Sequence, residues 1–320
     1  MRTPLLELQK VSKSFLLDSG TELRVLEDLS LSVFPNEAVV LLGPSGAGKS
    51  TALRIMTGLM PPTRGQVLRR GIGLEAVNRD VAMVFQNFAL LPWATVYDNI
   101  ALGLEAEERP TSELKARVKR AIDLVGLEGY EEAYPRELSG GMKQRVGLAR
   151  AIVMERPILC LDEPFSSLYL LSSETLRTEV LRLWMNQNTA TQAMVLITHN
   201  IAEAVFMANR ILVMGTNPGH IRVEVKNELP YPRDENSPGF KRMVAIIHDV
   251  ITETIIPDDP VWTPQVGGKP RTEAIETIPD VQVGEMLGLL ELLDDKGGRT
   301  DIFQLSHLAG KDFGKTLFIA

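Results

Sequence analysis

The sequence predicts an α/β protein whose sheet is mostly parallel and covered by helices. Apolar runs typical of buried strands alternate with helical patterns over residues 38–215, and this alternation favours a parallel sheet. A glycine-rich turn joins the first of these strands to a helix, and a long helical stretch interrupts the alternation. With 320 residues and an apolar fraction of 44%, the chain can bury a large core.

A small β-layer is expected at the N-terminus. Residues 5–34 contain two segments, LLELQKVSKSF and LRVLEDLSLSV, in which apolar and polar side chains alternate. This period of two is typical of half-buried strands. The polar stretch DSGTE separates the segments and suits the turn of an antiparallel pair.

The central sheet is expected to start at the apolar run AVVLLG, residues 38–43, which leads into a helix from about Lys49 to Leu59. The middle of the chain, about 90–152, is expected to form a helical insert, because apolar side chains recur there at spacings of three and four. Further strands are expected at 157–164, 194–200 and 210–215, and further helices at 111–125, 142–154 and 172–188.

The character of the chain changes after Gly215, where proline residues become frequent. We therefore expect three parts. Residues 1–232 form the main domain, residues 233–275 form a linker with one helix near 238–254, and residues 276–320 form a small, mainly helical segment. The last part is too short for an independent core.

Composition excludes several classes of protein. The net charge of −7 and pI near 5.3 give no basic field for a nucleic-acid backbone, so no nucleic-acid partner is expected. No stretch of about 18 consecutive apolar residues is present, which predicts neither a membrane span nor a secretion signal. The single cysteine, Cys160, lies in an apolar run and is expected to be a buried strand residue.

A phosphate-binding loop is the most specific feature of the sequence. Residues 43–50, GPSGAGKS, match the pattern G-x-x-x-x-G-K-[ST] between a predicted strand and a predicted helix. Backbone N–H groups at such a helix N-terminus favour bound phosphate. Lys49 is expected to reach the β and γ phosphates of ATP, and Ser50 to ligate Mg²⁺. The whole predicted loop comprises Gly43, Pro44, Ser45, Gly46, Ala47, Gly48, Lys49, Ser50 and Thr51.

Two carboxylates follow the apolar strand ILCLDEP, where sites of open α/β sheets gather. Asp162 is expected to hold Mg²⁺, and Glu163 to orient and deprotonate the attacking water. The next apolar strand ends at His199, which alone would be an ordinary strand-end residue.

A second phosphate clamp is expected at LSGGMKQR, residues 138–145. Ser139, Gly140 and Gly141 precede a helix and could offer a hydroxyl and amides to a phosphate. Because the chain already has a loop for its own nucleotide, a second clamp predicts that two copies enclose two ATP molecules.

Together these motifs resemble the nucleotide-binding subunit of ABC transporters over roughly residues 4–232. The resemblance implies a P-loop NTPase (RecA-like) core, an N-terminal antiparallel β-layer and a helical subdomain that carries the ABC signature. It implies that Phe15 stacks on adenine, although Phe15 packing within the β-layer is the alternative. It also implies that Gln86 senses the γ-phosphate and the metal, that His199 is the switch histidine, and that Gln144 lies with the signature residues at the nucleotide.

Two strings resemble one group of importers. They are VFQNFALLPWATVYDNIALGL at 84–104 and YPRELSGGMKQRVGLARAI at 134–152, which are similar to importers of nitrate, sulfonate, taurine or bicarbonate. This resemblance implies that a membrane permease docks near Gln86–Trp93, with Trp93 as local core the alternative. It also implies a periplasmic or extracellular solute-binding protein as an indirect partner, and a peripheral location on the cytoplasmic face of the membrane.

One departure concerns Tyr169, because the family usually has an aspartate there that couples the two sites. Its loss predicts a slower or less cooperative ATPase. The C-terminal segment from about 275 resembles the start of an accessory domain of this importer group, and its acidic character disfavours DNA binding. The alternative function is a non-hydrolysing or soluble regulatory ABC-type module that uses ATP only to dimerise; Asp162, Glu163 and His199 disfavour it, and Tyr169 weakly favours it. A soluble ABC ATPase that acts on nucleic acid or ribosomes should have two fused nucleotide modules or a long coiled-coil insertion, and the sequence has neither.

Overall fold

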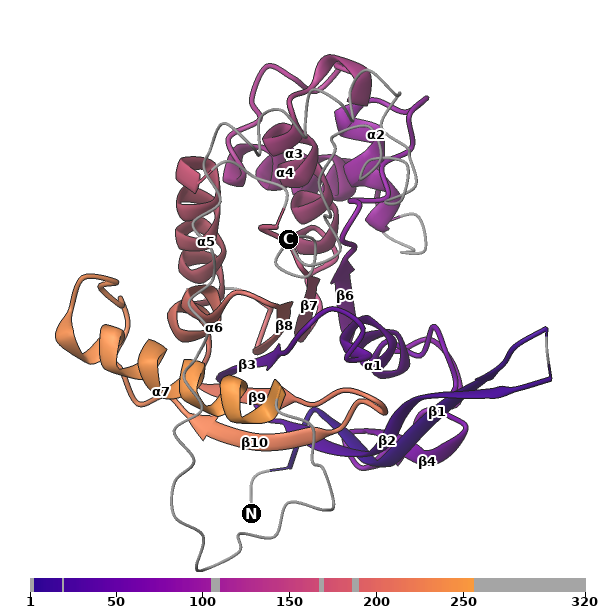
Figure 1. Ribbon diagram of the computed structural model, residues 1–320. Helices are drawn as coiled ribbons and strands as arrows, with labels where there is room; N and C mark the ends of the chain where they lie inside the picture. The colour runs from indigo at the N-terminus through magenta and orange to yellow at the C-terminus, as the bar shows by residue number, and fades with distance from the viewer. Residues whose placement is uncertain (1–2, 19, 105–109, 167–169, 186–189, 256–320) are drawn as a thin grey trace, which may run out of the picture. The chain divides into compact units, whose positions relative to one another are not determined.

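The computed structural model describes residues 3–18, 20–104, 110–166, 170–185 and 190–255 (Figure 1). The chain divides into two compact units, Met1–Asp258 and Asp259–Ala320, and every described residue belongs to the first. The expectations for Tyr169 and for residues 276–320 lie outside the described residues and stay predictions.

A six-stranded sheet forms the centre of the described unit, with the strand order β10-β9-β3-β8-β7-β6. Strand β3 pairs in parallel with both β8 and β9, β7 pairs in parallel with β8 and β6, and β10 is antiparallel to β9. This confirms the mostly parallel sheet. The strands are β3 (Glu37–Leu42), β6 (Val81–Val84), β7 (Ile158–Asp162), β8 (Ala193–Thr198), β9 (Arg210–Met214) and β10 (Ile221–Lys226).

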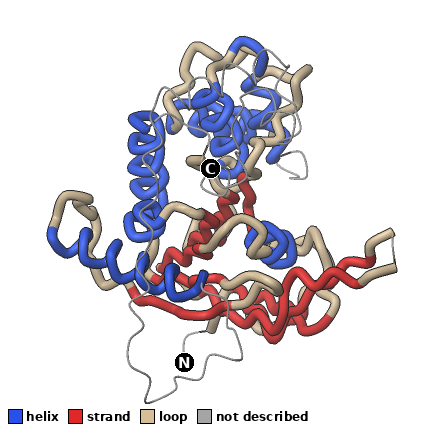
Figure 2. The backbone as a smooth tube through the Cα atoms, viewed as in Figure 1, coloured by secondary structure: helices blue, strands red, loops and turns tan. Residues whose placement is uncertain are grey.

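A second sheet of four strands, in the order β2-β1-β4-β5, is antiparallel throughout. It confirms the predicted β-layer, with two long strands where the sequence alternates and two short ones after α1 (Figure 2). The strands are β1 (Leu6–Leu16), β2 (Glu22–Val33), β4 (Arg64–Arg69) and β5 (Ile72–Gly73).

The helices fall into those that follow a strand of the central sheet and those of the helical insert. In the insert, α2, α3 and α4 pack against one another between β6 and β7 of the chain (Figure 1). Within the described ranges, none of the helices is long and apolar enough to cross a membrane. The helices are α1 (Lys49–Met56), α2 (Val96–Ala101), η1 (Leu102–Leu104), α3 (Thr111–Leu124), η2 (Pro135–Glu137), α4 (Gly140–Ile152), α5 (Leu170–Met185), α6 (Ile201–Met207) and α7 (Pro238–Ile255).

Two hydrophobic clusters lie on opposite faces of the central sheet. Along β3, Val40 and Leu42 belong to the cluster shared with the helical insert, whereas Val39 and Leu41 belong to the cluster shared with α1 and the β-layer. Because successive strand side chains point to opposite faces, an uninterrupted apolar run is what a strand buried on both sides requires.

Helix α7 lies in the stretch that was expected to be a linker. Residues 233–275 were expected to connect two domains and to hold one helix near 238–254, and α7 packs against α6 and β10. Its side chains Phe240 and Ile247 are buried in the same cluster as the helical insert. The proline residues around α7 are typical of a linker, yet the apolar face of the helix has a partner in the core. The main unit therefore extends beyond residue 232.

Candidate nucleotide-binding site

The predicted site residues lie where three neighbouring strands end. Strand β3 leads into the glycine-rich loop, β7 ends at Asp162 and β8 ends at Thr198. In the register of the sheet, Leu42 pairs with Thr198, and Asp162 pairs with Ile197. The carboxyl ends of these strands are thus level with one another, which is where open α/β sheets bind ligands.

The loop at 43–50 depends on two glycines. Gly46 and Gly48 have φ angles of 84° and 80°, which glycine adopts without the penalty that a Cβ atom brings. A Cβ atom on Gly48 would also lie 2.6 Å from the side chain of Leu26. Gly48 caps the N-terminus of α1, so the loop delivers its backbone N–H groups to the positive end of a helix.

Lys49 places its ammonium among the acceptors of the site. Its side chain is 5% exposed, and Nζ donates to the carbonyl oxygens of Gly43 and Pro44, each at 2.8 Å. The same Nζ lies 4.0 Å from Oε1 of Glu163. Burial lowers the pKa of Lys49, while Glu163 and Asp162 act in the opposite direction. The lysine is therefore held by groups that a phosphate oxygen could replace.

Ser50 and Asp162 form a pair suited to a divalent cation. The Ser50 hydroxyl donates to Oδ1 of Asp162 at 3.0 Å, and Asp162 is 4% exposed. Burial raises the pKa of the Asp162 carboxyl, and the hydrogen bond from Ser50 partly offsets this. A hydroxyl and a carboxylate are hard oxygen ligands, and Mg²⁺ in phosphate sites takes one or two protein oxygens beside those of the substrate. The pair fits that ion.

Glu163 has a strained backbone directly after β7. Its φ angle is 45°, which is uncommon for a residue with a side chain and marks positions held by their surroundings. Its N–H donates to the carbonyl of Ile197 at 3.0 Å. Oε2 lies 3.4 Å from Nδ1 of His199. The two side chains are 15% and 54% exposed, so they are positioned to meet solvent or a ligand together.

The LSGG segment begins helix α4 in the helical insert. Ser139 is the N-cap, and its Oγ accepts from the N–H of Met142 at 3.3 Å. Ser139 and Gly140 are exposed, and a Cβ atom on Gly140 would contact nothing within 4 Å. The start of this 13-residue helix is therefore open at the surface, with its first N–H groups accessible to an anion.

Comparison with known proteins identifies the family. The model of the family described as ABC transporter matches residues 26–166. An uncharacterized ABC transporter ATP-binding protein of Methanocaldococcus jannaschii is 37% identical over 254 residues, which cover 78% of this chain and 94% of that protein.

This chain belongs to the ABC transporter ATP-binding proteins. The aliphatic sulfonates import ATP-binding protein SsuB of Bacillus subtilis is 38% identical, covering 76% of this chain and 92% of that protein. The taurine import ATP-binding protein TauB of Pseudomonas putida is also 38% identical, covering 76% of this chain and 91% of that protein. A dimeric ATP-binding cassette bound to ADP and Pi superimposes with a TM-score of 0.63 at 28% identity, covering 70% of this chain and all of that one. The ATPase class and the P-loop fold expected from the motifs are thereby confirmed.

Three further residues, whose roles were implied by the family resemblance, lie in other parts of the chain. Gln86 lies just after β6 and is exposed, and Trp93 is 74% exposed, which excludes the alternative that Trp93 is local core. Phe15 lies in β1 opposite Leu23 and is half-buried. The Lys13 ammonium lies 5.2 Å from the centre of the Phe15 ring. Stacking of Phe15 on adenine stays a prediction.

Gln144 differs from its expected place at the nucleotide. The side chain is 1% exposed, and both of its amide heavy atoms are buried without a hydrogen-bond partner. It is five residues beyond Ser139, and at 3.6 residues per turn this places the two side chains on different faces of α4. In this structure Gln144 is therefore not available to a ligand.

Glu203 is a residue of this site that the motifs did not indicate. Oε2 of Glu203 accepts from the Thr198 hydroxyl at 2.6 Å, and the same hydroxyl oxygen accepts from the N–H of Asn200 at 3.0 Å. The side chain of Asn200 in turn caps the N–H of Glu203 at 3.2 Å. These bonds fix the residues on both sides of His199. The sequence signal was a carboxylate at the third position after an N-cap asparagine, a capping pattern.

A Glu203→Gln variant is expected to gain stability relative to the parent as the pH is raised from about 5 to about 8. Burial raises the pKa of Glu203, against the smaller opposing effect of the Thr198 hydrogen bond. A raised folded-state pKa means that the contribution of the carboxyl to stability is present at low pH and lost as the pH passes that pKa. Glutamine cannot lose a proton, so the Glu203→Gln variant does not undergo this loss of stability.

Urea unfolding at both pH values measures this difference. The exposed Glu174, changed to Gln, is the matched control and should keep the pH dependence of the parent. Equal pH dependence in the parent and in Glu203→Gln would show that Glu203 does not titrate in this range.

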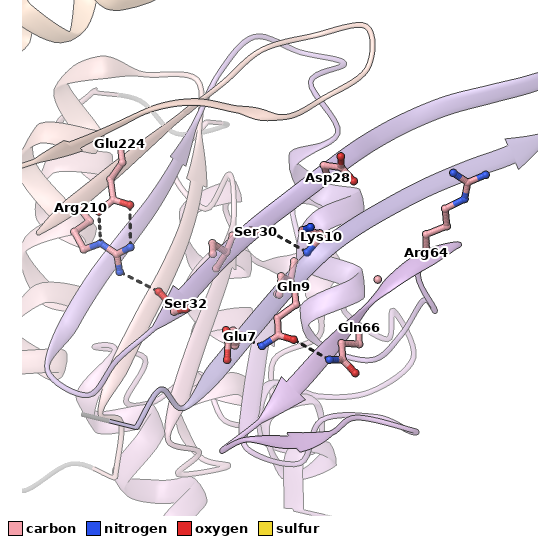
Figure 3. Close-up of a pocket in the computed structure, with 13 residues that line it drawn as sticks. Glu7, Gln9, Lys10, Asp28, Ser30, Ser32, Arg64, Gln66, Arg210 and Glu224 are labelled. Atoms are coloured by element: carbon pink, nitrogen blue, oxygen red, sulfur yellow. Dashed lines mark hydrogen bonds and ion pairs between the residues drawn. The ribbon is translucent and has the colours of Figure 1, made fainter. Parts of the chain in front are cut away.

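A separate open pocket of about 910 Å³ lies on the antiparallel β-layer (Figure 3). Residues of both charge signs line it, including Lys10, Arg64 and Asp28. At one end Arg210 pairs with Glu224, with Nε to Oε1 at 2.8 Å. None of the predicted site residues lines this pocket, so it is not the nucleotide site.

Proposed function

We propose that this ATPase is the motor subunit of an importer for a small anion of the nitrate, sulfonate, taurine or bicarbonate type. The observation that carries the motor function is the contact of Lys49, Ser50, Asp162, Glu163 and His199 at one edge of the sheet. The solute class is supported by the relatives named as importers of aliphatic sulfonates and taurine, at 38% identity.

In the proposed reaction the residues divide the work of phosphoryl transfer to water. Lys49 binds the β and γ phosphates, and Ser50 and Asp162 hold Mg²⁺. Mg²⁺, when bound, neutralises charge on the phosphates. Glu163 accepts the proton of the attacking water, and His199, 3.4 Å from Glu163, orients that carboxylate and the γ-phosphate.

We propose a homodimer in which each subunit completes the other's site. The N–H groups at the start of α4, with Ser139, Gly140 and Gly141, would bind the γ-phosphate of ATP held by the partner subunit. The exposure of Ser139 and Gly140 at the surface supports this, since residues 43–51 are proposed to bind the chain's own nucleotide.

The permease is proposed to dock on residues 86–93. The run from Ala89 to Trp93 is apolar, and the 74% exposure of Trp93 is unusual for a tryptophan without a partner. Docking there places the chain on the cytoplasmic face of a membrane as a peripheral subunit, with a solute-binding protein on the other side as an indirect partner.

The non-hydrolysing alternative gives Glu163 no role. A module that uses ATP only to dimerise has no need of a strained carboxylate beside a histidine, and the φ angle of 45° at Glu163 favours hydrolysis. Tyr169, which lies outside the described residues, is the feature that favours the alternative.

The proposed motor is tested by measuring mass in solution by analytical ultracentrifugation, with ATP and EDTA, with ATP and Mg²⁺, and without nucleotide. We expect ATP to drive dimers. Release of inorganic phosphate, assayed in the same samples, is expected only with Mg²⁺. A chain that stays monomeric with ATP even when hydrolysis is blocked by EDTA or by Glu163→Gln would contradict the sandwich.

The solute class needs its own experiment. A strain that lacks this chain is expected to lose growth on taurine or ethanesulfonate as the sole sulfur source, while growth on sulfate persists. Unchanged growth on both sulfonates, together with lost growth on nitrate, would reassign the solute within the group.

A further inference from the structure

The loop between β6 and α2 has a strained backbone beside the exposed tryptophan. Phe88 and Ala89 have φ angles of 58° and 45°, so two successive residues with side chains occupy the left-handed region. Such conformations persist where neighbouring structure imposes them. We call residues 86–95 the docking loop, and Trp93 is its most exposed large side chain.

Arg150, in the last turn of α4, holds the strained part of this loop. Nη1 donates to the carbonyl of Ala89 at 2.8 Å, and Nη2 donates to the carbonyl of Phe88. One turn earlier, a Cβ atom on Gly147 would lie 3.3 Å from Cβ of Phe88. The helix surface thus lets the loop backbone approach closely and then binds both of its carbonyl groups with one guanidinium.

Asn99, in α2, holds the other end of the docking loop. Its side chain is fully buried. Oδ1 accepts from the N–H of Leu91 at 2.8 Å, and Nδ2 donates to the carbonyls of Leu91, Ala94 and Thr95 at 2.9–3.1 Å. Trp93 therefore stands on a backbone that is fixed on both sides.

Helix α4 carries the signature at one end and Arg150 at the other. It starts at Gly140, after the Ser139 cap, and ends at Ile152, a length of about 20 Å. The helix packs against α2 and α3, so one continuous element joins the signature residues to the two carbonyls that Arg150 binds.

We propose that Arg150 is a positioning residue that keeps the docking loop in its strained conformation and ties it to the signature helix. The permease would then meet a preformed surface, and closure of the ATP-bound dimer would reach that surface through α4. The second part rests on the proposed dimer and docking site, whereas the first part concerns the isolated chain.

Hydrogen–deuterium exchange of the peptide covering residues 85–95 tests the first part without nucleotide. The N–H groups of Phe88, Ala89, Leu91 and Ala94 are hydrogen-bonded. We expect their exchange to become about tenfold faster or more in Arg150→Lys, which retains the charge but not the two-pronged donor, and faster still in Arg150→Met.

Arg145→Met is the matched control. Arg145 also lies on α4; its Nη1 donates to the carbonyl of Val125 at 2.8 Å and its Nη2 lies 3.7 Å from Oε1 of Glu179, and neither partner belongs to the docking loop. This variant should leave exchange of residues 85–95 unchanged. Loop exchange that is equal in the parent and Arg150→Lys, or equally fast in Arg150→Lys and Arg145→Met, would overturn the proposal.

The second part is tested in a Glu163→Gln background with ATP and Mg²⁺. We expect ATP to slow exchange both at the start of α4 and in the docking loop, and Arg150→Lys to abolish the slowing in the loop alone. Dimers that form while the loop responds equally with and without the Arg150 change would overturn this coupling. Absence of ATP-driven dimers in the parent would instead overturn the proposed function, and the exchange data without nucleotide would still decide the first part.

Discussion

Replacing Glu163 by Gln is expected to lower the steady-state turnover of ATP by about 10²–10⁴-fold. Glutamine has nearly the same size but cannot accept the proton of the attacking water. The backbone at position 163 is expected to keep its φ angle of 45°, because its N–H donates to the carbonyl of Ile197 and the substitution does not change that bond. Binding of ATP and ATP-driven dimerisation should persist, and release of inorganic phosphate measures the loss.

The control for this prediction is Glu174→Gln, a change of the same chemistry on an exposed position of α5. It should turn over ATP like the parent. Equal turnover in Glu163→Gln and Glu174→Gln would remove Glu163 as the general base. Loss of dimers in Glu163→Gln would show that the carboxylate serves assembly rather than chemistry.

Replacing Lys49 by Met is expected to weaken ATP binding by about a hundredfold or more. The ammonium would make two charge-assisted hydrogen bonds to phosphate, and their loss costs about 3 kcal/mol or more, where 1.4 kcal/mol is about tenfold in affinity. Methionine keeps the unbranched stem in the space that the 5% exposed side chain fills. Titration with a fluorescent ATP analogue gives the dissociation constant.

Lys241→Met, at an exposed position of α7, separates this effect from a general loss of positive charge. Its dissociation constant should match that of the parent. Thermal unfolding checks that Lys49→Met is folded. A folded Lys49→Met variant with parental affinity would mean that phosphate is bound by the loop N–H groups without the lysine.

Much of the site could be predicted from the sequence because its chemistry is local. The loop around Lys49 is a continuous string between a strand and a helix, and Asp162 and Glu163 follow an apolar strand. His199 taken alone was an ordinary strand-end residue, and only the resemblance to ABC transporters indicated a role for it. Its 3.4 Å approach to Glu163 follows because parallel strands end at the same edge of a sheet.

Features that depend on distant packing could not be predicted. Helix α7 looks like part of a linker until its partners α6 and β10 are known. Burial of Gln144 follows from how α4 is rotated against its neighbours, which a motif does not encode. The bonds from Arg150 to residues 88 and 89 cross about 60 positions of the chain. Sequence spacing contains no signal for such a contact.

The burial of strand β3 on both faces limits which substitutions the gene can accept there. Its side chains from Ala38 to Leu42 are at most 1% exposed and alternate between the two hydrophobic clusters. A strand with a solvated face can accept polar substitutions at every second position, but residues 38–42 of β3 include no solvated position. Evolution can therefore exchange these residues only for apolar ones of similar volume. The five codons before the phosphate-binding loop should thus be among the least tolerant in the gene, although none of them encodes a residue that touches ATP.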